Sequence, residues 1–283
     1  MSHLCELDRR DADERTGSFV TERTVPMTSP ILVTGGTGTI GSRVVPLLTN
    51  AGRDVRVVSR HPGTDEPGVV HVEADTVSGQ GLTESLAGVD VVLHLAGGAK
   101  GDDVAAKNLT AAAHTAGVKH LILISVTGAD AMPIGYFRAK AEAERIVATC
   151  GVPFTILRSA QLHDFVLPIV RGMGRLPLLP RPGGLRFEPV AVDDVAARLC
   201  ELTLGAPAGR VADIAGPEVS TLRELADVYY DETGRSHRPS LPVRIPGKVG
   251  RAYRAGDNLA DDGVQRGSTT WREFLAARHS VGR

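Results

Sequence analysis

The stretch Ile31-Leu32-Val33-Thr34-Gly35-Gly36-Thr37-Gly38-Thr39-Ile40-Gly41 decides the fold of this chain. Its three leading apolar residues predict a buried parallel strand. A glycine-rich turn follows, and then apolar residues recur at helical spacing: Ile40, Val44, Val45, Leu47, Leu48 and Ala51. The turn matches G-x-G-x-x-G at Gly36, Gly38 and Gly41, and it matches the looser G-x-x-G-x-x-G from Gly35. Strand, tight turn and helix in this order are the context in which the pattern binds a dinucleotide.

Glycine is favoured at each of these positions in the turn for a physical reason. It permits positive φ, a close approach of the backbone to a pyrophosphate, or tight packing of the helix on the strand. The helix N-terminus adds N–H donors and a partial positive charge for the phosphates. We therefore expect the cofactor to contact Gly35, Thr37, Gly38, Thr39 and Ile40. The alternative is a turn with a purely structural role.

Composition narrows the class of protein. The chain has 283 residues, a formal net charge of −1 and 42% hydrophobic residues. Since no general basic field is present, we expect neither nucleic acid nor a membrane as partner. No stretch approaches the roughly 20 apolar residues that span a bilayer. Cys5, Cys150 and Cys200 are scattered, which indicates no disulfide framework, no metal site and a cytoplasmic location. We expect a small-molecule substrate and a monomer or homodimer.

Residues 1–29 differ from the rest of the chain. Charged residues crowd this segment, which has no apolar core and lacks the hydrophobic centre of a signal peptide. We interpret it as a disordered tail. Met27 lies just before the first expected strand. We therefore also hypothesise that translation of the natural protein begins at Met27.

The remaining chain alternates strands and helices. Strands are expected at 54–59, 69–73, 89–95, 121–124 and 153–157, and helices at 82–89, 102–117 and 136–145. This order predicts an α/β fold of the Rossmann type, with a doubly wound parallel sheet and right-handed crossovers. Ligands of such sheets bind outside the carboxyl ends of the strands. We assign residues 30–158 to the dinucleotide-binding core.

Beyond residue 158 the rhythm loosens, and 159–283 are interpreted as a small substrate lobe interleaved with the last strands. We expect strands at 187–192 and 211–214, and helices after Asp193-Asp194, through Tyr230 and over 271–277. Residues 175–184 and 255–269 are expected to be loops. For the helix through Tyr230, Ser220 with Arg223 is an imperfect capping box and Thr221 with Glu224 a weaker one.

The end of the second expected strand indicates which cofactor binds. NAD-preferring Rossmann folds carry an acid there that binds the ribose 2′-hydroxyl. This chain has Ser59-Arg60 instead, and a guanidinium beside a hydroxyl suits a 2′-phosphate. We expect NADP in preference to NAD, the alternative being an ordinary solvated arginine.

Two further strand ends bear on the cofactor. Asp75 follows the third strand, where it either accepts a bond from the adenine amine or caps the next segment. Ala96, Gly97 and Gly98 leave the fourth strand with small residues, as expected where backbone passes close to a cofactor. His94, inside the same apolar run, is interpreted as a core histidine with its hydrogen bonds satisfied.

Tyr136 and Lys140 stand four residues apart on an expected helix and share one face of it. A nearby ammonium stabilises phenolate, so we expect the tyrosine pKa to be lowered. Ser125 leaves the fifth strand at the carboxyl edge, where its hydroxyl could hold a substrate carbonyl. Thr127 is the alternative hydroxyl, because the interval from Ser125 to Tyr136 is short.

The sequence resembles the short-chain dehydrogenase/reductase superfamily, and within it the atypical NmrA-like or NAD(P)H-binding branch. The likeness spans roughly residues 30–235. It rests on T-G-G-T-G-T-I-G at 34–41, V-V-S-R at 57–60, L-A-G at 95–97, I-S-V-T-G at 124–128, Y-F-R-A-K at 136–140, T-I-L-R-S-A-Q-L-H-D-F at 155–165 and F-E-P-V-A-V-D-D-V-A at 187–196. The resemblance implies NADP binding and hydride transfer, with Tyr136 as proton donor, Lys140 on the nicotinamide ribose and Ser125 orienting the substrate.

The sixth expected strand is followed by Gln161, His163 and Phe165, candidates for the wall beside nicotinamide and substrate. The alternative is a loop in which Asp164 caps a helix. Pro46 is expected to interrupt the first helix.

Two classes of function follow. The first is an NADP-dependent oxidoreductase acting on a small carbonyl, quinone or similar conjugated compound. The second is a non-catalytic NADP-binding redox sensor of the NmrA-like type, because the fold alone does not settle function. A nucleotide-sugar epimerase-like isomerase is a weaker third hypothesis.

Overall fold

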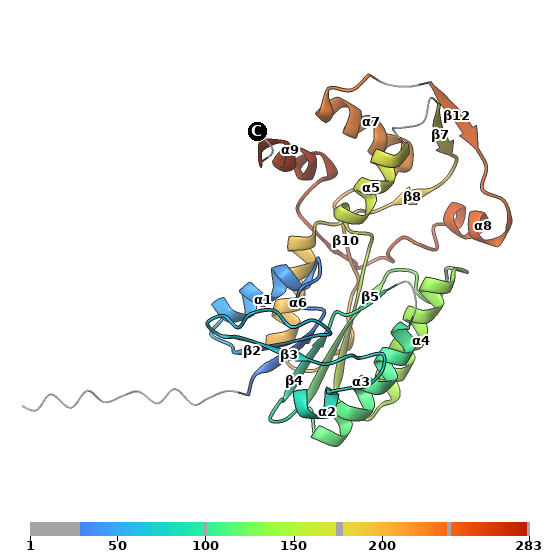
Figure 1. Cartoon of the computed structure of the whole chain (residues 1–283). Helices are drawn as coiled ribbons and strands as arrows, with labels where there is room; N and C mark the ends of the chain where they lie inside the picture. Colours follow the sequence, from blue (N-terminus) through green and yellow to red (C-terminus); the bar gives the residue numbers. More distant parts are fainter. Residues whose placement is uncertain (1–28, 99–100, 174–177, 237–238, 282–283) are drawn as a thin grey trace, which may run out of the picture.

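The computed structural model describes residues 29–98, 101–173, 178–236 and 239–281 (Figure 1). Of the tail expected at 1–29, residues 1–28 lie outside the described residues, and so does the alternative start at Met27. Within these ranges no helix is long and apolar enough to cross a membrane.

A parallel sheet forms the centre of the molecule. Its strands lie in the order β13-β10-β6-β5-β4-β1-β2-β3, with β9 beside β6, and every pairing in it is parallel. Their bounds are β1 (Ile31–Thr34), β2 (Val55–Ser59), β3 (Val69–Glu73), β4 (Val91–His94), β5 (His120–Val126), β6 (Phe154–Ser159), β9 (Gly209–Arg210), β10 (Ile214–Ala215) and β13 (Gln265–Arg266). Strands β2 and β3 are added on one side of β1, and β4, β5 and β6 are added on its other side. This change in the order of the strands opens a crevice at the carboxyl ends of β1 and β4, which is where Rossmann folds bind their ligands. The predicted doubly wound fold is confirmed.

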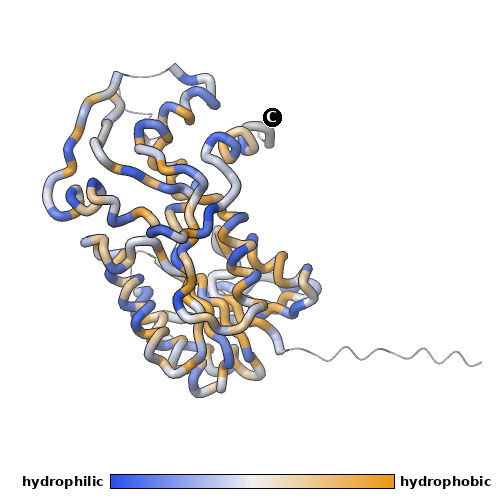
Figure 2. The backbone as a smooth tube through the Cα atoms, turned by 180° about the vertical axis from the view of Figure 1, so that it is seen from behind, coloured by the Kyte–Doolittle hydropathy of each residue, from blue (hydrophilic) through white to orange (hydrophobic). Residues whose placement is uncertain are grey.

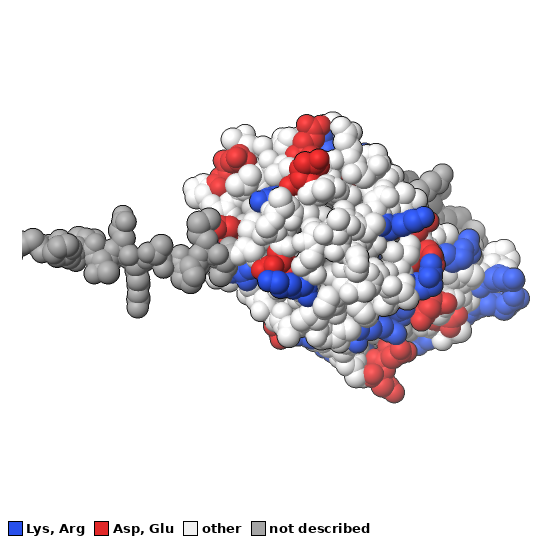
Figure 3. Space-filling view, turned by 90° about the horizontal axis from the view of Figure 1, so that it is seen from below, with Lys and Arg blue, Asp and Glu red and all other residues white. Residues whose placement is uncertain are grey.

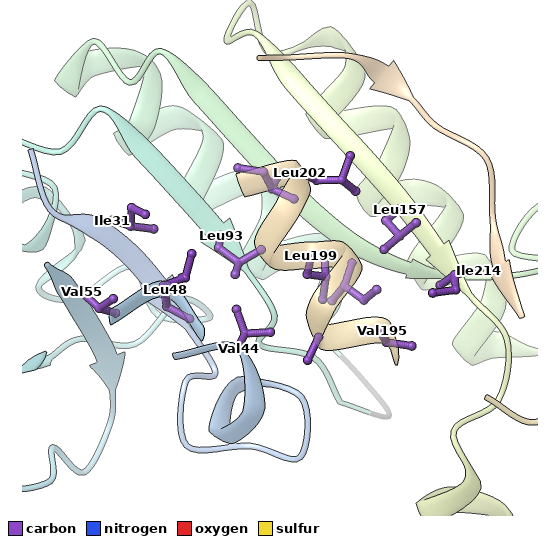
Figure 4. Packing of buried hydrophobic residues seen from close by; sticks show 14 of the residues in the cluster. Ile31, Val44, Leu48, Val55, Leu93, Leu157, Val195, Leu199, Leu202 and Ile214 are labelled. Carbon is purple, nitrogen blue, oxygen red and sulfur yellow. The ribbon is translucent and has the colours of Figure 1, made fainter. Parts of the chain in front are cut away.

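Helices cover both faces of this sheet (Figure 1). One face carries α1 (Gly41–Asn50) and α6 (Val192–Leu204), and the other carries α2 (Leu82–Ser85), α3 (Asp102–Ala116) and α4 (Gly135–Thr149). Along β1, Ile31 and Val33 pack toward the first pair of helices and Leu32 packs toward the others. Figure 4 shows the first of these cores closing around Leu48 and Leu199. Continuous apolar strands are therefore buried on both faces.

A smaller lobe stands above the carboxyl edge of the sheet (Figure 1). Its core joins α5 (His163–Met173), α7 (Leu222–Thr233) and α9 (Trp271–Val281). Two short ribbons flank it, β8 (Arg186–Phe187) with β11 (Ser220–Thr221) and β7 (Leu179–Pro182) with β12 (Ser240–Val243). The remaining helix, α8 (Gly247–Ala255), packs through Ala252 on the start of α4. In Figure 2 the apolar residues concentrate in the sheet.

Several local expectations are corrected. The expected loops at 175–184 and 255–269 contain β7 and β13, because pairing partners distant in sequence complete these strands. The strand expected at 187–192 is instead β8 followed by the start of α6. Helix α1 runs through Pro46 without interruption.

Helix capping also differs from the expected pairs. Thr221 and Glu224 form both halves of the capping box of α7, although this pair had the weaker pattern. Asp194 lies in the first turn of α6, and its carboxylate accepts bonds from the backbone N–H groups of Ser268 and Thr269. It thereby holds the segment that precedes α9.

Candidate cofactor-binding and active site

A cavity of about 560 Å³ opens at the carboxyl ends of β1 to β4. Most of the residues that line it come from the turns that follow those strands. They are Thr34, Gly35, Thr37, Gly38, Val58, Ser59, Arg60, Ala74, Asp75, Thr76, Val77, Ala96, Gly97, Gly98, Gly101, Asp102 and Ala105. Nine of the predicted cofactor residues therefore line one cavity: Gly35, Thr37, Gly38, Ser59, Arg60, Asp75, Ala96, Gly97 and Gly98. Thr39, which is exposed, and Ile40, which packs against the core, are not among the lining residues.

The glycine turn is shaped by close backbone contacts. Gly35 has φ of +70°, and a Cβ there would lie 2.7 Å from the backbone nitrogen of Ala96. A Cβ on Gly41 would lie 2.2 Å from the carbonyl oxygen of Gly35. Any larger residue at either position would fill the floor of the cavity or push the helix away. The turn thus forms the cradle that a pyrophosphate requires.

At the end of β2, Ser59 and Arg60 lie on the cavity wall. The Ser59 hydroxyl donates a hydrogen bond to the carbonyl oxygen of His61 at 3.0 Å and accepts one from the His61 N–H at 3.2 Å. The hydroxyl therefore shapes the turn, and the exposed guanidinium of Arg60 is the cation available on this wall.

Asp75 caps the segment after β3 and also lines the cavity. One carboxylate oxygen accepts the backbone N–H of Val77 at 2.9 Å, which is the capping interaction. This bond is the main reason that the pKa of the carboxyl is lowered, and Arg60 lowers it further. Because Asp75 also lines the cavity, its carboxylate faces the space that the cofactor would occupy.

Lys140 reaches the cavity wall from α4. Its ammonium lies 2.9 Å from the Asp102 carboxylate, and both side chains are more than nine-tenths buried. The other carboxylate oxygen accepts the backbone N–H of Gly98 at 2.8 Å. A Cβ on Gly97 would lie 2.8 Å from the Lys140 Nζ, so the ammonium lies against this lining residue, although Lys140 is not itself among the residues that line the cavity.

The expected lowering of the Tyr136 pKa is wrong. Tyr136 is 37% exposed and makes an edge-to-face contact with Phe137. Burial of the phenol raises its pKa above the ordinary value of 10.0, and the negative charge of Asp102 raises it further.

The two candidate hydroxyls at the end of β5 differ in their surroundings. Ser125 is 5% exposed, and its hydroxyl makes no hydrogen bond to any residue in the described part of the chain. Thr127 donates to the Asp213 carboxylate at 2.9 Å and is therefore engaged in joining the end of β5 to the segment before β10. Ser125 is thus the hydroxyl with unused hydrogen-bonding capacity.

His94 is a satisfied core histidine, as predicted. Thr34 Oγ1 lies 2.6 Å from its Nδ1 and also accepts the backbone N–H of Ala96. The hydroxyl and the imidazole thus share one hydrogen bond, whose direction follows the tautomer of His94. Burial, helped by the positive charge of Lys140, lowers the pKa of His94 to about 4.

The three substrate candidates after β6 diverge. Phe165 is 67% exposed on α5, and Gln161 is partly buried at the end of β6. His163 is fully buried, with its ring centroid 4.8 Å from Phe274 and 5.5 Å from Trp271. This histidine belongs to the core of the lobe, and none of the three lines the cavity.

Sequence reasoning missed Asp102, Thr76 and Val77 as parts of the site. Asp102 was expected only to begin a helix, and nothing in its local pattern distinguishes it from Asp103. Its partner, Lys140, is 38 residues away, so only the packing of α3 on α4 reveals the pair. No group of three or more potential metal ligands occurs among the described residues.

Comparisons with known proteins support the binding of a nicotinamide dinucleotide. A family model described as NAD(P)H-binding matches residues 35–202. A (4-alkanoyl-5-oxo-2,5-dihydrofuran-3-yl)methyl phosphate reductase of Streptomyces griseus is 33% identical over 245 residues, covering 79% of this chain and 84% of that protein. Quinone oxidoreductase 2 of Escherichia coli is 26% identical over 214 residues, covering 72% of this chain and 75% of that protein.

Among solved structures, an NADPH-dependent quinone oxidoreductase of Escherichia coli complexed with NADPH superposes with a TM-score of 0.74 at 21% identity, covering 88% of this chain and 99% of that one. A nucleoside-diphosphate-sugar epimerase of Staphylococcus aureus superposes with a TM-score of 0.73 at 19% identity, covering 87% of this chain and 99% of that one. These two likenesses concern the fold. The family model matches more than half of this chain, and the matched residues include most of those that line the cavity. This chain therefore belongs to the NAD(P)H-binding family.

Proposed function

We propose that this chain is an NADPH-dependent oxidoreductase that transfers hydride to a small carbonyl, quinone or similar conjugated compound. The observation that carries the proposal is the placement of Lys140. It shares a helix face with Tyr136 and reaches the Gly97 corner of the cofactor cavity. The reductase names of the Streptomyces griseus and Escherichia coli relatives support the same reaction class.

Preference for NADPH over NADH is supported by the charge at the end of β2. Arg60 is exposed on the cavity wall, and the strand carries no acid at the position where one would repel a 2′-phosphate. A guanidinium can bind such a phosphate through two parallel hydrogen bonds. Ser59 would hold the turn that presents this guanidinium, since its hydroxyl is bonded to His61.

When bound, the cofactor supplies the hydride. Tyr136 supplies the proton to the reduced oxygen, and its raised pKa keeps the phenol protonated at neutral pH. Lys140 would donate to the ribose hydroxyls, since its ammonium touches the cavity at Gly97. Ser125 would donate its unused hydroxyl hydrogen to the substrate carbonyl. The lobe formed by residues 159–283 would cover the substrate.

The test is consumption of NADPH across a panel of quinones, enones and a butenolide phosphate ester. We expect turnover by the unaltered protein and loss of at least about 100-fold in kcat for Tyr136→Phe, which removes a general acid. NADPH affinity should hardly change in this variant. Equal turnover by both proteins would exclude Tyr136 as the donor.

A specific observation also favours the second candidate function, an NADP-binding sensor. The phenol is not primed for release of its proton, because its pKa is raised and Lys140 is paired with Asp102. A sensor predicts micromolar or tighter NADPH binding by calorimetry with no NADPH oxidation on any member of the panel.

A further inference from the structure

Asp102 and Lys140 form a buried ion pair between two helices. Asp102 is the first residue of α3, and Lys140 lies in the second turn of α4. Their charged atoms are 2.9 Å apart, with side-chain exposures of 6% and 8%. Burying two charges is expensive, and the attraction between them often only balances the cost. The pair therefore calls for an explanation other than stability alone.

The position of Asp102 is unusual for a site that receives phosphates. Its carboxylate lines the cofactor cavity, where a negative charge opposes a polyanionic ligand. Two contacts fix it there, the Gly98 N–H at 2.8 Å and the Lys140 ammonium. A carboxylate held in this way directs the lysine at the Gly97 corner.

The pair also determines the electrostatic surroundings of the phenol. The charged and titratable groups on the elements packed around Tyr136 include Lys140 and Arg138 on α4, Asp102 on α3 and Tyr253 on α8, which packs against Phe137. Of these, the carboxylate is the group whose charge raises the pKa of Tyr136. It also partly offsets the effect of Lys140 on His94.

We propose that Asp102 is a positioning residue of the active site, which holds the Lys140 ammonium at the Gly97 corner and shields the Tyr136 hydroxyl from its positive charge. This assignment rests on the proposed function of Tyr136 and Lys140. It explains why a carboxylate is kept in the wall of an anion-binding cavity. Through the lysine, Asp102 sets both the affinity for the cofactor and the protonation of the donor.

The alternative is a strut that only joins α3 to α4. The two roles predict opposite signs for Asp102→Asn. If Asp102 positions Lys140, the substitution removes a negative charge from the cavity wall, while the side-chain oxygen of Asn can still accept from the ammonium and keep it at the Gly97 corner. NADPH should then bind about threefold more tightly or better, and the phenol should titrate about 1 pH unit lower. A strut predicts weaker binding, because the cavity wall loosens, and an unchanged phenol.

The experiment uses the full chain and does not depend on turnover. NADPH affinity is measured by calorimetry for the unaltered protein, Asp102→Asn and the matched control Asp103→Asn, which alters the same helix turn outside the cavity lining. Tyrosinate absorbance is titrated for each protein and for its Tyr136→Phe counterpart, and the difference isolates one phenol among the four tyrosines.

Two more variants keep the test decisive if Asp102→Asn folds poorly. Asp102→Glu retains the negative charge, so the NADPH affinity and the pKa of the Tyr136 phenol should both stay at their wild-type values. Lys140→Gln leaves the carboxylate unbalanced, so the phenol should titrate higher than in the unaltered protein. Weaker NADPH binding in Asp102→Asn, or an unmoved phenol in Lys140→Gln, would overturn the proposal. Absence of turnover on every substrate would instead refute the reductase and leave these readouts intact.

Discussion

The α-carbon of Gly41, at the start of α1, lies so close to Gly35 that a Cβ on Gly41 would stand 2.2 Å from the Gly35 carbonyl oxygen. This contact seats the helix directly on the turn that ends β1. It brings the N-terminus of α1 to the floor of the cavity, where a helix end favours phosphate. The last glycine of the fingerprint is therefore required by backbone packing.

Gly41→Ala should destabilise the fold by about 3 kcal/mol or more, because backbone atoms that cannot rotate away must separate. Thermal unfolding and NADPH affinity measured together would show both losses. Gly172→Ala is the control, since a Cβ at that helical glycine has open space and should leave the protein unchanged or more stable. Equal behaviour of the two variants would contradict the packing argument.

Charge removal at Glu144 should be costly, because this residue holds a buried partner. The Arg158 guanidinium donates to both Glu144 carboxylate oxygens, at 2.8 and 2.7 Å, and to Asp130 at 3.0 Å. Glu144→Gln should lower the free energy of unfolding by about 3 kcal/mol, as for other broken buried pairs. Glu142→Gln, two residues earlier on the exposed face and paired with Arg145, should have no measurable effect in the same urea titration.

Stability should fall in acid through two buried histidines. Burial lowers the pKa of both His94 and His163 to about 4 from an ordinary 6.5. Below pH 6.5 the unfolded chain binds protons that the folded chain refuses, so each histidine removes about 1.4 kcal/mol per pH unit down to pH 4. His163→Leu should make the urea midpoint less dependent on pH in this window. An unchanged slope would show that His163 titrates normally.

Arg60 should determine cofactor choice. Arg60→Asp places a carboxylate where the 2′-phosphate would bind, and kcat/KM for NADPH should fall on the order of 100-fold. The internal control is kcat/KM for NADH in the same variant, which should be unchanged or higher than in the unaltered protein. A parallel loss with both cofactors would indicate a damaged turn.

Ser125→Ala should separate catalysis from stability. The buried hydroxyl has no hydrogen-bond partner among the described residues, so its removal should leave the melting temperature nearly unchanged while turnover drops. Thr127→Val is the matched control, because it breaks a bond to Asp213 and should cost about 1–3 kcal/mol of stability. A Ser125→Ala protein with full activity would exclude its role toward the substrate.

Both signs of charge are interspersed on the face of the molecule shown in Figure 3. This distribution agrees with the net charge of −1.

The sequence by itself determined the Rossmann core and most of the cofactor cavity. Apolar runs, glycine turns and helix spacing are local signals, and in a parallel sheet the carboxyl ends of the strands always meet at one edge. The positions of Gly35, Arg60 and Gly97 around a single cavity follow from that rule.

Only the tertiary structure decided the electrostatics of the site and the architecture of the lobe. The Lys140–Asp102 pair joins two helices far apart in sequence, and burial of the phenol together with the Asp102 charge reversed the expected direction of the Tyr136 pKa. Likewise β7 and β13 exist because distant segments supply their hydrogen bonds, and His163 faces Trp271 because α9 packs on α5. Charges and short strands depend on which neighbours come within a few ångströms, and local sequence does not encode these neighbours.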